Sequence, residues 1–158
     1  MRLGSFVLGG VAVIAGLAAR PKVDLAVDSV EIELPPDAVV HHFRDRMGSG
    51  SEVIVASGDR VVRRFRGRAG RFRYATVEVV TFGRASIAFE HLRGPFASCS
   101  ERFDAAPSGA GTILTHSGGF ALRGGVFTWP LARTAVKRAF EAHVREHMDL
   151  FARERALT

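Results

Sequence analysis

Six candidate strands between Glu52 and Phe120, separated by turns, constrain the fold more than any other feature of the chain. They are Glu52–Ala56, Arg60–Arg66, Arg71–Thr81, Ser86–Leu92, Phe96–Phe103 and Thr112–Phe120. Every connection between them is short and contains glycine, which is typical of hairpin turns. Because parallel strands need long crossovers, connections this short predict that each segment pairs antiparallel with the next.

A helix is predicted on either side of this region. Val30–Leu34 alternates as a strand, and Pro36 and Asp37 then suit the first turn of a helix whose apolar stripe includes Phe43. A long C-terminal helix is predicted from near Pro130 toward Leu157, with one apolar face spaced by three or four residues: Val136, Phe140, Val144, Met148 and Phe151. The order of elements predicts an α+β fold in which a curved antiparallel sheet wraps around one long helix.

Four strings carry a resemblance to a known family: Ile32–Ala38 (IELPPDA), Phe89–Phe96 (FEHLRGPF), Glu101–Phe103 (ERF) and Gly111–His116 (GTILTH). Together with the final helix they resemble the START-like (SRPBCC) superfamily of helix-grip proteins, in its polyketide cyclase/dehydrase and lipid-transport branch. The resemblance covers residues 23 to 155. It implies an apolar cavity between sheet and helix, in which members hold lipids, polyketides or other hydrophobic ligands, and it brings no catalytic signature. The segment Gly48–Ser51 leaves little room for the second short helix that usually closes the cavity.

An uncharged, mostly apolar run, Leu3–Ala19, precedes the predicted domain. One interpretation is a short membrane anchor, and another is a signal peptide cleaved after Gly16-Leu17-Ala18. A third interpretation is that the run is a buried core helix, or that the start codon has been assigned upstream of the true domain. Arg20 and Lys22 favour an anchor with a cytoplasmic domain by the positive-inside rule. We therefore expect a leader over residues 1–22 and a START-like domain over residues 23–158.

The charge balance and the single cysteine limit the chemistry. The formal net charge is +6, which favours anionic partners in general, with nucleic acid the least favoured among them. Cys99 is the only cysteine, so an internal disulfide and thiolate clusters for zinc or iron–sulfur are excluded. We expect no cofactor.

Two histidines are the best candidates for polar chemistry. Alternation places His91 on the strand face of Phe89, and His116 on that of Leu114 and Phe120. If these faces point inward, both imidazoles can orient a ligand carbonyl or act as acid and base. The alternative is a pair of core histidines bonded to backbone carbonyls. Tyr74 and Glu78 are weaker candidates for the same role.

A metal site is not predicted. His143 and His147 have the spacing of two ligands on one helix face, but each only flanks the apolar stripe and no third ligand accompanies them.

The sequence favours a protein that binds or carries a hydrophobic small molecule or lipid and is not an enzyme. The predicted ligand-binding residues are Tyr74, Phe89, His91, Leu114, His116, Phe120, Trp129, Phe140, Val144 and Met148. One alternative is a polyketide cyclase or dehydrase that uses His91 and His116. Another is a membrane-surface domain whose arginine-rich hairpin contacts anionic lipid through Arg63, Arg64, Arg66 and Arg71, although such a hairpin can also simply discourage strand pairing.

Overall fold

The computed structural model describes residues 21–46, 51–69, 72–109 and 111–153. The leader predicted over residues 1–22 lies almost entirely outside this range. Among the described residues, none of the helices combines the length and the hydropathy needed to cross a bilayer.

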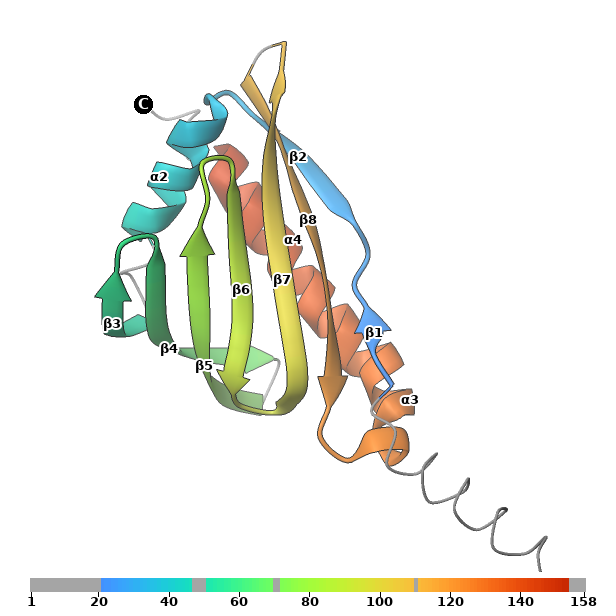
Figure 1. The fold of residues 1–158 in the computed structure, drawn as a ribbon. Helices are drawn as coiled ribbons and strands as arrows, with labels where there is room; N and C mark the ends of the chain where they lie inside the picture. The colour runs from blue at the N-terminus through green and yellow to red at the C-terminus, as the bar shows by residue number, and fades with distance from the viewer. Residues whose placement is uncertain (1–20, 47–50, 70–71, 110, 154–158) are drawn as a thin grey trace, which may run out of the picture.

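One eight-stranded antiparallel sheet forms the frame of the domain (Figure 1). Its main path runs β1-β8-β7-β6-β5-β4-β3, and β2 also pairs with β8. The strands are β1 (Val23–Asp24), β2 (Asp28–Ile32), β3 (Ser51–Ser57), β4 (Arg60–Ala69), β5 (Phe72–Phe82), β6 (Ser86–Arg93), β7 (Phe96–Ser108) and β8 (Gly111–Leu122). The six candidate strands between the predicted turns correspond to β3 to β8. The helix-grip architecture is therefore confirmed.

The first helix, α2 (Pro36–Arg46), begins where the two prolines predict it. The Asp37 carboxylate accepts a hydrogen bond from the Ala38 amide at 2.9 Å, which satisfies one of the free amides of the first turn. The buried side chains of α2, Val39, Val40 and Phe43, pack against the sheet. Residues 47–50 are outside the described range, and β3 begins at Ser51.

The C-terminal helical region is less uniform than predicted. It starts with the 3₁₀ turn η1 (Gly125–Phe127) and the single turn α3 (Trp129–Leu131), continues through the π-helical turn η2 (Ala132–Val136), and becomes α4 (Lys137–Arg153). α4 runs obliquely across one face of the sheet, behind β7 and β8 in Figure 1. We call the sheet face that α4 covers the inner face.

β7 extends through Pro107, where a turn was predicted. β7 pairs with β6 only as far as Asp104, so beyond that point one side of β7 has no partner strand in the described chain. Proline is tolerated there because no ladder hydrogen bond is lost on the open side.

The inner face holds two packed apolar clusters. The larger joins α2 and α4 to the central strands and includes Ile87, Phe89, Leu114, Val144 and Met148. The smaller lies near β1 and η2: Val23, Leu25, Cys99, Phe120 and Ala132. Phe140 of α4 packs against both.

Candidate functional site

A row of ionisable side chains crosses the inner face of the sheet. Arg63 pairs with Glu78 and Glu78 with His91 in cross-strand register, while Phe103 pairs with His116. Glu101 precedes Phe103 by two residues on β7 and so shares its face. Five polar residues from five neighbouring strands thus lie among the apolar side chains of the core. We call Arg63, Glu78, His91, Glu101 and His116 the inner network.

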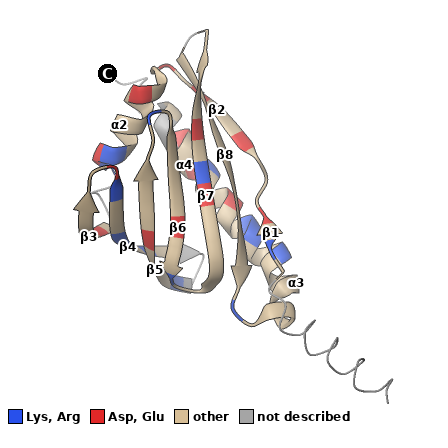
Figure 2. Cartoon of the chain, in the orientation of Figure 1, with Lys and Arg blue, Asp and Glu red and all other residues tan. Residues whose placement is uncertain are grey.

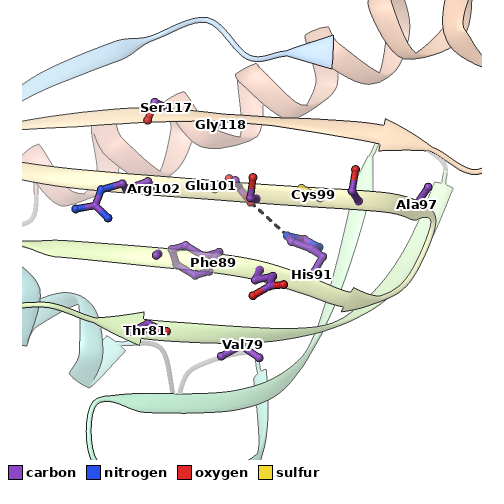
Figure 3. A pocket seen from close by; sticks show the side chains of 14 residues that line it. Val79, Thr81, Phe89, His91, Ala97, Cys99, Glu101, Arg102, Ser117 and Gly118 are labelled. Atoms are coloured by element: carbon purple, nitrogen blue, oxygen red, sulfur yellow. Dashed lines mark hydrogen bonds and ion pairs between the residues drawn. The ribbon is translucent and has the colours of Figure 1, made fainter. Parts of the chain in front are cut away.

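The inner network is continuous. Arg63 Nε donates to Glu78 Oε1 at 2.6 Å, and Glu78 Oε2 lies 3.4 Å from His91 Nε2. The two oxygens of Glu101 are shared between the histidines, with His91 Nε2 at 3.3 Å from Oε1 and His116 Nε2 at 3.2 Å from Oε2. Figure 3 shows the contact between His91 and Glu101. At both contacts the imidazole Nε2 donates, because an ionised carboxylate can only accept.

Gly118 makes space for Glu101. It is the cross-strand partner of Glu101, and a Cβ at this position would lie 2.6 Å from the Ser100 carbonyl oxygen and 3.3 Å from Glu101 Cγ. The shorter of these contacts does not occur in folded proteins without a shift of the backbone. Glycine at position 118 therefore allows the Glu101 side chain to extend between β7 and β8 toward His116.

The network controls the protonation of its neighbours. Burial alone raises the pKa of Glu101, but the hydrogen bonds from His116 and His91 outweigh burial and hold the pKa of this carboxyl below its usual range. Burial, reinforced by the negative charges of Glu101 and Glu78, raises the pKa of Tyr74 and also that of the Cys99 thiol. The site thus combines an ionised carboxylate with a phenol and a thiol that both remain protonated at neutral pH.

Two buried polar atoms have no hydrogen-bond partner among the described residues: His91 Nδ1 and Thr76 Oγ1. The His91 ring instead meets the ring of Phe96 edge-on, with centroids 5.4 Å apart. An unsatisfied buried polar atom costs about 1–3 kcal/mol, so orienting the Nε2 side of His91 toward the two carboxylates is achieved at a loss of stability.

The inner face is less tightly packed beside the network than elsewhere. Phe65 and Tyr74, on β4 and β5, contact each other with ring centroids 6.2 Å apart, and Phe65 lies at the same separation from His143 of α4. These three residues and Phe140 are only half-buried, whereas Leu114 and Phe120 are fully buried. Accessible surface therefore remains between the β4–β5 hairpin, α4 and the network.

The structure brings together the two histidines predicted to act as a pair, and it adds residues that the sequence analysis missed. His91 and His116 both point inward, and Glu101 connects them. Glu78, a weaker candidate, belongs to the same network. Glu101 was overlooked although alternation places it between Cys99 and Phe103 on one strand face. A single acidic residue on an apolar strand face is the signal that could have identified it.

The predicted ligand-binding residues fall into three groups. Tyr74, His91 and Phe140 lie at or beside the accessible region, and His116 is fully buried behind it, bonded to Glu101 and packed on Phe103. Five others are packed into the two apolar clusters, where they support the site from behind: Phe89, Leu114, Phe120, Val144 and Met148. Trp129 is not on the inner face; it is 36% exposed, and the Arg133 guanidinium stacks on its ring at 4.6 Å.

The arginines predicted to form one surface patch do not share a surface. Arg63 points inward and its side chain is 13% exposed, because successive residues of β4 alternate between faces. Arg64 points outward and pairs with Glu52 at 2.8 Å, and Arg66 is exposed. Arg71 lies outside the described residues.

Metal binding by the network was also considered. Ligand atoms of His91, Cys99 and Glu101 lie within 4.8 Å of one another. His91 Nε2 and Glu101 Oε1 already bond to each other at 3.3 Å, and Cys99 packs in the smaller apolar cluster. We therefore interpret the cluster as a hydrogen-bonded network. His147, exposed on α4, donates from Nδ1 to the His143 carbonyl oxygen at 2.9 Å.

An open hollow lies on the opposite, outer face of the sheet, across β5 to β8 (Figure 3). Alternation assigns to it the outward side chains Val79, Thr81, Ala88, Glu90, Ser100, Arg102 and Ser117. The lining also includes Phe89, Cys99 and two members of the inner network, His91 and Glu101, so the hollow lies directly behind the network.

Comparison with protein families gives one match: the model described as polyketide cyclase / dehydrase and lipid transport matches residues 25–152. A comparison with curated protein sequences finds no match.

Solved structures with the same fold include an aromatase/cyclase and a START superfamily protein. The Zhui aromatase/cyclase from Streptomyces sp. R1128 has a TM-score of 0.73 at 16% identity, covering 85% of this chain and 93% of its own. The protein TTHA0849 from Thermus thermophilus has a TM-score of 0.68 at 22% identity, covering 87% and 97%. A START superfamily protein from Mycobacterium smegmatis has a TM-score of 0.56 at 14% identity, covering 78% and 99%. At these identities the likeness establishes the fold alone.

Proposed function

Because the chain belongs to the polyketide cyclase/dehydrase and lipid transport family, we propose that it binds a hydrophobic small molecule between the β4–β5 hairpin and α4. The ligand has an apolar body and at least one hydroxyl or carbonyl group, which the inner network recognises. One observation carries this proposal: a buried, charged network beside accessible aromatic side chains on an otherwise apolar face.

The energetics of the network support a role in recognition. Two carboxylates are removed from water here, and replacing buried ion pairs by apolar side chains is often neutral or stabilising. Two apolar clusters already hold the sheet against its helices. A network that stability does not require is best explained by what it binds. Phe65, Tyr74 and Phe140 offer aromatic surface to the apolar body, and Glu101, 12% exposed, accepts from a hydroxyl group.

Binding of 2-naphthol and of 2-methylnaphthalene, compared by titration, tests the proposal. The two probes have nearly the same shape and differ in one hydroxyl group. A hydrogen bond to a charged group contributes about 1.5–3 kcal/mol, so we expect roughly 10- to 100-fold tighter binding of 2-naphthol. Glu101→Gln should remove most of this preference. Glu90→Gln, on the outer face of the neighbouring strand, is the matched control and should keep it. Failure of both probes to bind, or equal affinity for them, would contradict the proposal.

A second candidate function is proton transfer next to a ligand carbonyl, the chemistry that cyclisation and dehydration share. It is favoured by the sharing of Glu101 between two imidazoles, each donating from Nε2. Deuterium exchange at the carbon next to the carbonyl of 2-tetralone, followed by NMR in D₂O, tests this function. We expect exchange above the buffer rate that falls in Glu101→Gln and persists in Glu90→Gln. Exchange at the buffer rate with the unmodified protein would reject catalysis while leaving the binding proposal intact.

A further inference from the structure

The segment that connects β8 to α4 exposes large apolar side chains at one end of the molecule. Phe127 is 80% exposed, Leu131 53% and Trp129 36%. All three belong to the short segment made of η1 and α3, and Pro130, between Trp129 and Leu131, is exposed as well. We call Phe127, Trp129 and Leu131 the apolar tip.

The shape of the tip is fixed by its own hydrogen bonds. Thr128 Oγ1 donates toward the carbonyl oxygens of Arg123 and Gly125, both at 3.1 Å, and the Ala132 amide donates to the Thr128 carbonyl oxygen at 2.9 Å. Ala132, directly after the tip, is buried in the smaller apolar cluster. Exposure of the three apolar side chains is therefore a property of a well-bonded turn and needs a partner to explain it.

The chain enters the described structure at the same end. β1 pairs antiparallel with the last part of β8, Val23 opposite Phe120, so Pro21 and Lys22 lie beside the end of β8 that leads into the tip. β1 and α3 are neighbours at this end in Figure 1. The residues immediately before Pro21 contain the uncharged run Leu3–Ala19. An apolar segment long enough to enter a bilayer is thus attached next to the apolar tip.

Charge around the tip is predominantly basic. Arg123 and Arg133 are exposed on either side of it. Lys22, which directly precedes β1, is exposed too, and its Nζ lies 3.8 Å from the Asp24 carboxylate. In Figure 2 the tip itself is free of charged residues and basic residues flank it. The Arg133 guanidinium stacks on the Trp129 ring at 4.6 Å, which places a cation next to an indole as at a membrane–water interface. Basic side chains near the surface attract anionic lipid headgroups.

We propose that the apolar tip inserts into the interfacial region of a lipid bilayer, next to the point where the N-terminal run joins the domain. Phe127 and Leu131 enter the acyl-chain boundary, Trp129 lies at headgroup depth, and Arg123 and Arg133 contact lipid phosphates. This surface is separate from the inner network and does not depend on ligand binding.

The sequence supplies its own probe, because Trp129 is the only tryptophan. The full chain is added to vesicles of phosphatidylcholine and phosphatidylglycerol, with or without phosphatidylcholine brominated on its acyl chains. We expect the Trp129 emission to shift to shorter wavelength and to fall by at least half with the brominated lipid. Quenching by aqueous iodide should fall at the same time.

A matched pair of variants separates the tip from the N-terminal run. Phe127→Ser with Leu131→Ser should abolish most of the quenching by brominated lipid even where the chain sediments with the vesicles. Val53→Ser with Val55→Ser removes two other exposed apolar side chains, 51% and 53% exposed, on the distant edge strand β3, and should leave quenching unchanged. Two results would overturn the proposal. One is that, in the unmodified chain, iodide still quenches the Trp129 emission and brominated lipid does not. The other is that the chain stays in the supernatant when the vesicles are sedimented.

Discussion

The close approach of β7 and β8 at Gly118 gives the sharpest prediction from this structure. Gly118→Ala introduces a methyl group 2.6 Å from the Ser100 carbonyl oxygen and 3.0 Å from Glu101 Cα, both backbone atoms that cannot move independently of the ladder. Overpacking of this kind costs about 1–3 kcal/mol. For a chain of this length each kcal/mol corresponds to about 2–4 °C in Tm, so a fall of roughly 2–12 °C is expected.

Gly109→Ala is the matched control. An added Cβ at Gly109 meets nothing within 4 Å, and its backbone does not lie in the left-handed region. The change should leave the free energy of unfolding within about 0.5 kcal/mol of the original, as is usual for surface positions. Urea unfolding followed by circular dichroism gives the difference between the two variants.

The site supplies a second readout for the same substitution. A shift of Glu101 alters the environment of both imidazoles bonded to it, so the His91 and His116 side-chain signals in ¹H–¹⁵N NMR spectra should move in Gly118→Ala and not in Gly109→Ala. Equal stability of the two variants together with unchanged histidine signals would refute the assignment of Gly118 as the residue that makes room for the network.

Three further predictions follow from the charges and burial of the site. The pKa of Glu101 is lowered in the folded state, so its ionisation stabilises the fold above the unfolded pKa of about 4.3, and this contribution is lost as pH falls through the folded pKa. The difference in unfolding free energy between the unmodified chain and Glu101→Gln should therefore become smaller in acid. Glu90→Gln is the control and should show no such pH-dependent difference. Cys99 is buried and its pKa is raised, so iodoacetamide at pH 8 should label it only after unfolding, and rapid native labelling would contradict its placement. Arg63→Met leaves the Glu78 carboxylate without its main partner and should destabilise the fold by about 3 kcal/mol in denaturant titrations. This is at the low end for a buried ion pair, because His91 remains near Glu78. A loss of stability below about 1 kcal/mol would mean that the pair is solvated.

The sequence was sufficient for the order of elements and for the inward direction of the two histidines. Short glycine-containing turns determine antiparallel neighbours, and alternation within a strand determines which side chains share a face. His91 and His116 needed only these two rules. The spacing of apolar residues from Val136 to Phe151 likewise predicted the helix that covers the inner face.

Glu101 and Arg63 show where this reasoning stopped. Each is a charged residue among other charged residues, and the general expectation places such side chains in water. Alternation already places Glu101 on the strand face of Cys99 and Phe103. The contacts of Glu101 with two histidines, and of Arg63 with Glu78, depend on cross-strand register. Register involves residues far apart in the chain and is not encoded in local periodicity. The prediction that Trp129 binds ligand did not rest on helical phase, and the structure places Trp129 in α3, 36% exposed and separated from α4 by a π-helical turn.

The smaller apolar cluster connects the two surfaces proposed to act. Ala132 follows the apolar tip directly, and Cys99 precedes Glu101 by one repeat of the strand pleat; both pack in this cluster with Phe120. Phe120 stacks on Phe140 of α4, with rings 5.6 Å apart and nearly parallel, and Phe140 borders the accessible region beside the network. Tightly packed interiors transmit displacement because they contain few voids. The position of the tip relative to a bilayer and the geometry around Glu101 are therefore set by one rigid unit, although each surface has its own chemistry and its own test.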